Sequence, residues 1–146
     1  MSVQFLITSK KFNLAPSDRT KTTKPVPTDS GDLYLMGLLE KQRGLNVAKD
    51  ALSLRVGMAD ADETRYIEIQ LGLIDADFLH ISAMITSYLE SSTVFKAITT
   101  DGLAQIRKIV EQLQGVAAAR EKAADIVQLV TRLLEEWDGS GNGAAN

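Results

Sequence analysis

The chain has one histidine, His80, which follows Asp77 by three residues. In a helix the two side chains would share one side. An acid-x-x-His pair is half of the motif of carboxylate-bridged metal bundles, which need two such pairs and two further acids. One histidine excludes this site within a single chain, although a symmetric dimer would supply the second pair. The simpler interpretation is a histidine at a helix–helix contact, and we expect no bound metal.

The other residues that could support catalysis are poorly placed for it. Asp75 and Asp77 fall on different flanks of one expected helix, so they do not form an acid–base pair. The chain contains no cysteine, and no base stands beside its serines, which leaves little for nucleophilic chemistry. We therefore expect no enzymatic activity and no cofactor. The lack of disulfides also fits a cytoplasmic protein.

Positive charge is concentrated near the N-terminus. Residues 1–27 carry five cations against Asp18, a net charge of +4, whereas the rest of the chain has 11 basic and 18 acidic residues, a net charge of −7. Such an arm can contact phosphates or an acidic protein surface. Phe12 is the only aromatic residue among these cations, so stacking on nucleic-acid bases has little support. The candidate phosphate-binding residues, including a smaller patch further along, are Lys10, Lys11, Arg19, Lys21, Lys24, Arg107 and Lys108.

The two ends of the chain are expected to lie outside the helical part. Val3, Phe5 and Ile7 alternate with other residues, which predicts a short strand at 2–8. All three prolines fall between residues 16 and 27, so residues 1–29 are predicted to form an extended basic arm. An ordinary flexible terminus is the alternative. Residues 139–146 are rich in glycine and are expected to form a flexible tail.

The central segment, Tyr66 to Leu89, is predicted to be an amphipathic helix. Asp60 and Glu63 resemble a capping box, so the helix should begin near Ala61 and continue to about Glu90. Apolar residues recur in steps of four and three, which places them on one seam facing a core. This seam consists of Ile67, Leu71, Ile74, Phe78, Ile81, Ile85 and Tyr88.

A second apolar stripe lies on roughly the opposite face of the same helix. It consists of Tyr66, Ile69, Leu73, Ala76, His80 and Ala83. A surface helix of a monomer usually has one apolar stripe and one polar face. Two stripes indicate a neighbour on each side. The second neighbour is either another helix of this chain or a second copy.

An earlier helix is predicted from about Asp32 to Val56, with a seam of Leu35, Leu38, Leu45, Leu52 and Val56. Gly37 and Gly44 share a face on which a neighbouring helix could approach closely. The alternative is a break at Gly44, with that glycine as a left-handed cap. The seam stays in register across Gly44, which favours one continuous helix.

The last third of the chain also has helical periodicity, after an N-cap at Thr99 to Asp101. Gly115 separates two seams, so this part is either one long helix kinked at Gly115 or two helices. Val94, Phe95 and Ile98 are expected to form a short helical turn at the end of the bundle. The two seams are Leu103, Ile106, Val110, Leu113 and Ala117, and then Ile126, Val130, Leu133 and Trp137.

These patterns predict an all-α fold: an antiparallel bundle of three to four long helices over residues 30–138, with an extended N-terminal arm. No apolar run approaches the ~20 residues that span a bilayer, so no membrane partner is expected. We expect a non-catalytic protein that acts through protein–protein association, as a self-associating subunit or adaptor of a larger assembly. A nucleic-acid-associated subunit and a bundle enclosing an apolar small ligand are the alternatives. The candidate interface residues are Tyr66, Ile69, Leu73, His80, Ala83, Gly37 and Gly44.

Overall fold

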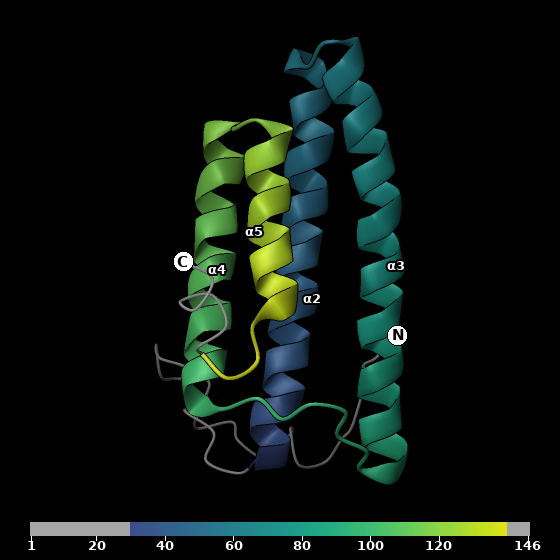
Figure 1. Cartoon of the computed structure of the whole chain (residues 1–146), viewed down its shortest axis with the longest axis vertical. Coiled ribbons are helices and arrows are strands. Elements are labelled where there is room, and N and C mark those ends of the chain that lie inside the picture. The colour runs from purple at the N-terminus through teal and green to yellow at the C-terminus, as the bar shows by residue number, and fades with distance from the viewer. Residues whose placement is uncertain (1–29, 140–146) are drawn as a thin grey trace, which may run out of the picture.

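The computed structural model describes residues 30–139, in which four α-helices pack together (Figure 1). They are α2 (Ser30–Arg55), α3 (Ala61–Ser91), α4 (Thr100–Ala119) and α5 (Ala123–Glu135), with the 3-10 turn η2 (Val56–Met58) after α2. This range contains no strand, which confirms the all-α class for the part of the chain described. The predicted arm of residues 1–29, with its strand at 2–8, lies outside the described residues, as does the tail beyond Gly139.

Helix α2 contacts each of the other three helices. Helices α4 and α5 lie side by side against it and also contact one another, whereas α3 packs mainly on α2 and more sparsely on α5 (Figure 1). Residues 30–139 therefore consist of a compact group of α2, α4 and α5, with α3 added along a remaining side of α2. This placement leaves much of α3 without a helical neighbour.

Four of the five predicted seam residues of α2 are buried, namely Leu35, Leu38, Leu45 and Leu52. The helix is continuous through Gly44, as expected, but it ends at Arg55, and Val56 in the following turn is exposed. The side chains at the centre of the bundle recur in steps of four and three, and they include three of the predicted leucines and a lysine. These fully buried residues are Tyr34, Leu38, Lys41, Leu45, Ala48 and Leu52.

Two glycines of α2 allow its neighbours to approach closely. A Cβ added to Gly37 would overlap the side chain of Ile98, and one added to Gly44 would lie 2.6 Å from Cδ2 of Leu133 and 3.0 Å from Cγ2 of Val110. The close approach expected at these glycines is therefore made by segments of the same chain. Both glycines are buried, so they offer no surface to a second chain in the packed bundle.

Helix α3 follows the sequence prediction closely. The Asp60 side chain caps it by accepting the Glu63 backbone N–H at 2.8 Å, as a capping box requires. Its predicted seam faces the core, where Ile67, Ile74 and Ile81 are buried. The other seam residues, Leu71, Phe78, Ile85 and Tyr88, are partly buried against the same core.

Two predictions for the later part of the chain need correction. Residues 92–99 contain no helical turn: Ile98 is buried beneath Gly37, whereas Val94 and Phe95 are exposed. The break between the last two helices does not occur at Gly115, which lies within α4. It occurs at Arg120, whose left-handed backbone (φ 53°) ends α4, and whose N–H donates to the Ala117 and Val116 carbonyls.

The first turn of α4 contacts the backbone that follows α5. Thr99 caps α4 by accepting the Gly102 N–H at 2.9 Å, and the Thr99 N–H donates to the Trp137 carbonyl oxygen at 3.0 Å. A Cβ added to Gly102 would overlap that same carbonyl group, whereas one added to the exposed Gly115 would have no atom within 4 Å. The two glycines of α4 thus have opposite environments.

We predict that Gly102→Ala lowers the free energy of unfolding by about 1–3 kcal/mol, because the new methyl group forces the Trp137 backbone away. Gly115→Ala is the matched control and should raise it by up to about 1 kcal/mol, since alanine favours the helix. Urea unfolding of both variants measures the difference. Equal effects of the two substitutions would contradict the contact between Gly102 and Trp137.

Candidate interaction surface

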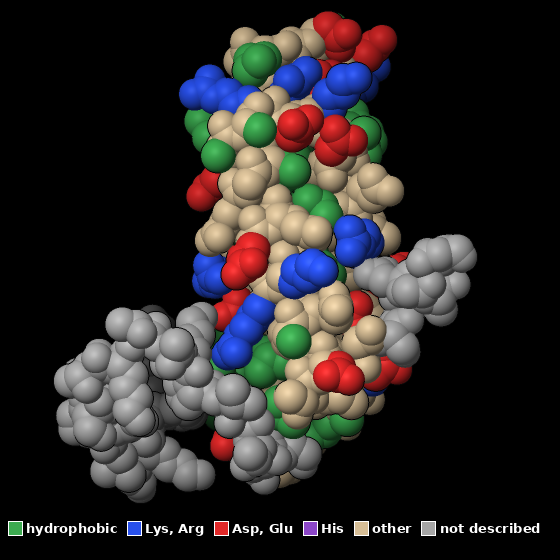
Figure 2. Space-filling view, turned by 90° about the vertical axis from the view of Figure 1, so that its left-hand side faces the viewer, with side chains coloured by type: hydrophobic (Ala, Val, Ile, Leu, Met, Phe, Trp, Pro, Cys, Tyr) green, Lys and Arg blue, Asp and Glu red, His purple; other side chains and the backbone are tan. Residues whose placement is uncertain are grey.

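The side of α3 that faces away from α2 exposes large apolar residues. Ile69 is 56% exposed, Leu73 53% and Leu79 68%, and the predicted interface residues Tyr66, His80 and Ala83 are also exposed. The structure therefore brings every predicted interface residue of α3 onto one accessible face. We call Tyr66, Ile69, Leu73, Ala76, His80 and Ala83 the outward stripe. The side of the molecule occupied by α4 differs, because its hydrophobic side chains are scattered among charged and polar ones (Figure 2).

Two pockets lie along the outward stripe. His80 lines one of about 320 Å³, which we call the Trp137 pocket, and Tyr66 lines the other, of about 560 Å³, which we call the Tyr66 pocket. Leu73 is seven residues from both, so it lies between them on the same face of the helix. At a rise of about 1.5 Å per residue, Tyr66 and His80 are about 21 Å apart along the axis. Each pocket thus borders one end of the segment of the stripe from Tyr66 to His80.

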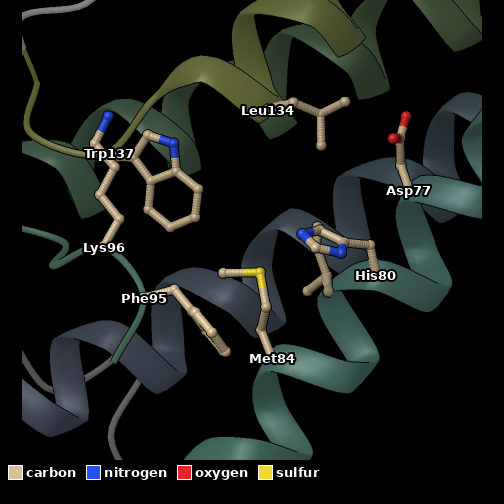
Figure 3. A pocket seen from close by; sticks show the side chains of 8 residues that line it. Asp77, His80, Met84, Phe95, Lys96, Leu134 and Trp137 are labelled. Carbon is tan, nitrogen blue, oxygen red and sulfur yellow. The ribbon is translucent and has the colours of Figure 1, made fainter. Parts of the chain in front are cut away.

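The Trp137 pocket combines an apolar lining with charged groups at its edge. In Figure 3 the Trp137 ring, the Met84 thioether and the His80 ring surround one space, and Asp77 lies at its border. Burial raises the pKa of Asp77, an effect that His80 partly opposes. A carboxylate with reduced hydration would gain from an approaching cation. The complete lining is Asp77, His80, Ile81, Met84, Phe95, Lys96, Leu134 and Trp137.

Lys41 of α2 contacts the Trp137 ring and helps to fix its position. The Lys41 ammonium lies 3.5 Å from the centroid of the Trp137 ring and donates to the Leu134 carbonyl oxygen at 3.0 Å. The first contact is a cation–π interaction, which strengthens when water is excluded. The second places a positive charge at the C-terminal end of α5, where the helix dipole favours it. Lys41 thereby fixes both the end of α5 and the aromatic side of the pocket.

Burial of Lys41 has an electrostatic cost. Desolvation lowers the pKa of Lys41 to about 7; the Glu136 carboxylate opposes this shift and the nearby charge of Lys96 adds to it. Glu136 is itself buried, and its Oε2 has no hydrogen-bond partner. Lys41, Glu136 and Glu40 are the buried acidic and basic side chains of residues 30–139.

Two residues that line the Tyr66 pocket, Arg55 and Glu63, form an ion pair. Arg55 donates from Nε and Nη2 to the two carboxylate oxygens of Glu63 at 3.0 and 3.1 Å, and from Nη1 to the Arg120 carbonyl oxygen at 3.1 Å. Glu63 also accepts the Ala123 N–H at 2.9 Å. These hydrogen bonds, with that from Arg55 foremost, lower the pKa of Glu63. The network joins α2, α3 and the turn between α4 and α5.

The candidate phosphate-binding residues fall into two groups. The arm cations Lys10, Lys11, Arg19, Lys21 and Lys24 lie outside the described residues. Lys108 is exposed, and Nε and Nη2 of the neighbouring Arg107 are buried without a hydrogen-bond partner. No group of three or more His, Asp or Glu side chains in residues 30–139 is arranged to hold a metal ion.

No known protein family, curated protein or solved structure matches this chain. Its function must therefore be argued from the surface itself. Among residues 30–139, one helix, α3, is long and apolar enough to cross a membrane by length and composition alone, and 17% of its apolar window is buried in the bundle.

The residues behind the Trp137 pocket were missed at the sequence level. Lys41 lies three residues after Leu38 and four before Leu45, which is a position where the helical spacing predicts a buried apolar residue. This spacing was the only sequence feature that indicated a buried lysine. Its partners Leu134, Glu136 and Trp137 are more than 90 positions away along the chain. Nothing in the local pattern connects them to Lys41.

We predict that stability rises with pH between about 7 and 10.5, because Lys41 is deprotonated over this range when folded but protonated when unfolded. The unfolded state then holds the extra proton, so raising the pH favours the folded state. Each unit of pKa difference corresponds to about 1.4 kcal/mol.

Lys41→Met should remove most of this pH dependence, whereas the exposed Lys108→Met should retain it. Urea unfolding of all three proteins at pH 7, 8.5 and 10 measures the slopes. A slope for Lys41→Met equal to that of the unsubstituted protein would contradict a buried lysine with a lowered pKa.

Proposed function

We propose that this protein is a non-catalytic, antiparallel helical bundle that associates with a second copy of itself through the outward stripe of α3. In this proposal α2, α4 and α5 provide a rigid support, and α3 provides the contact. The protein would then serve as a self-associating subunit of a larger assembly.

The observation that carries the proposal is the exposure of Tyr66, Ile69 and Leu73 on the outward stripe of a helix whose opposite face packs in the core. Single exposed apolar residues are common, but a continuous run of them on one helical face is typical of an interaction site. Ala76 and Ala83 lie on the same face and would let a partner helix approach closely. Tyr66 and His80, at the pockets, tolerate both water and a protein neighbour.

A contact between proteins explains α3 better than a membrane does. Lys49 of α2 pairs with Asp75 near the middle of α3 at 2.7 Å, and Asp77 follows two residues later. Carboxylates in the middle of a membrane-spanning helix are costly. The seam of α3 is also occupied by its contacts with α2, so its apolar content already has a role within the bundle.

We predict that Leu73→Glu weakens self-association at least about tenfold, because the contact would bury an unpaired charge. The free energy of unfolding should change by no more than about 0.5 kcal/mol, since Leu73 is half-exposed in the monomer. The matched control is Gln114→Glu, which adds the same charge at an exposed position of α4.

Sedimentation equilibrium over a range of concentrations, together with thermal unfolding, gives both quantities. If Leu73→Glu unfolds the protein at every concentration, the stripe belongs to the core. If its mass in solution equals that of the Gln114→Glu control, the stripe is not the contact.

A further inference from the structure

We infer that residues 1–29 of the same chain dock on the outward stripe of α3, with an aromatic residue of this arm in the Trp137 pocket and an adjacent lysine beside Asp77. This inference adds a regulatory element to the surface discussed above. Its functional meaning rests on the proposed self-association, but the docking itself can be tested separately.

The arm joins the bundle next to the Trp137 pocket. Helix α2 begins at Ser30, and Tyr34 in its second turn accepts the Phe95 backbone N–H through its hydroxyl group at 3.3 Å. The Tyr34 ring also lies 5.5 Å from that of Tyr88 on α3. Because Phe95 lines the Trp137 pocket, the chain preceding α2 starts close to it.

The arm is long enough to cover the stripe. Leu14 precedes Ser30 by 16 residues, which span up to about 55 Å when extended. The distance from His80 to Tyr66 is about 21 Å along α3. Residues 3–14 can therefore reach any part of the stripe without moving the bundle.

The charges of the two surfaces are complementary. Helix α3 contains six acidic residues and one arginine, Arg65, whereas residues 1–27 carry a net charge of +4. Glu63 and Asp75 already pair with α2. The acids that remain on α3 to attract the arm are Asp62, Glu68, Asp77 and Glu90.

The arm also supplies the required side chains. Phe12 follows Lys10 and Lys11 directly, and Phe5 lies among the apolar residues Val3, Leu6 and Ile7. An aromatic group suits the apolar lining of Met84, Leu134 and Trp137. The adjacent lysine would pair with Asp77, which lies across the pocket from its lining cation, Lys96 (Figure 3). The raised pKa of Asp77 is consistent with a carboxylate that would be stabilised by such a cation.

Docking within the chain is favoured over docking on a second copy. A segment tethered next to its site is present at a millimolar effective concentration, well above the usual concentration of a second molecule. The docked arm would compete with a second copy for the same stripe. Displacement of the arm, by salt or by an acidic partner, would then expose the stripe for association.

Cysteine cross-linking in the full chain tests the docking, because the protein has no cysteine of its own. Asn13→Cys is combined either with Ala76→Cys on the outward stripe or, as the matched control, with Gln114→Cys on α4. A short bis-maleimide is added at low protein concentration, and the products are separated by mass. We expect an intramolecular cross-link in the Asn13/Ala76 pair, formed roughly tenfold faster than in the control.

The electrostatic part of the contact is tested in the same assay. In about 1 M NaCl, where the Debye length is about 3 Å, the rate for the Asn13/Ala76 pair should fall toward that of the control. Replacing the five arm cations with Gln should have the same effect and should also strengthen self-association several-fold. Equal rates for the two pairs in low salt would overturn the inference. So would cross-links found only between two copies.

Different results would reject the docking of the arm and the proposed self-association. A rapid intramolecular cross-link in a protein that stays monomeric at all concentrations and salts would leave the docking intact and refute self-association. Self-association that Leu73→Glu weakens, with equal cross-linking rates for the two pairs, would support the outward stripe as an interface and reject the arm.

Discussion

The close approach of neighbouring segments to α2 at Gly37 and Gly44 determines the arrangement of the described residues. Ile98 occupies the space that a side chain at Gly37 would need, and Val110 and Leu133 occupy the space at Gly44. A larger residue at Gly44 would push α4 and α5 outward and loosen the seam around Leu45. Helices α4 and α5 occupy the side of α2 that carries Gly44. Helix α3 therefore packs along another side of α2, and only one face of α3 is in contact with it. The exposed apolar face of α3 is a consequence of this geometry.

A buried lysine lies at the end of the core where α5 ends. Lys41 lies one turn before Gly44, at a depth where an apolar residue would be expected, and its ammonium contacts the Leu134 carbonyl and the Trp137 ring. A buried ion near a carboxylate is seldom a source of net stability. Here it fixes the position of Trp137, and through Trp137 it shapes a pocket at the border of the α3 surface. One aromatic side chain, Trp137, thus connects the buried lysine to the proposed contact surface.

Local signals were sufficient for most helix positions. The caps Asp60 and Thr99 and the seam of α3 could be predicted because each depends on residues within one or two turns. Other features depend on contacts between distant segments. Arginine is an unusual left-handed cap, yet α4 ends at Arg120, whose carbonyl oxygen accepts a hydrogen bond from Arg55. Gly115, the residue expected to break the helix, is simply exposed. The α3 stripe could be located from spacing alone, but its pockets could not, because Trp137 and Phe95 join it only in three dimensions.

We propose that the outward stripe of α3 is the contact between copies of this chain. Backbone NMR spectra of the full chain, recorded over a dilution series in about 1 M NaCl to screen charge attraction from other segments, test it most directly. The account predicts concentration-dependent shifts at Ile69, Leu73 and His80, with unchanged signals at Gln112 and Gln114 on α4. Shifts centred on α4 would contradict this contact. So would unchanged signals on α3 in samples whose mean molecular mass increases with concentration.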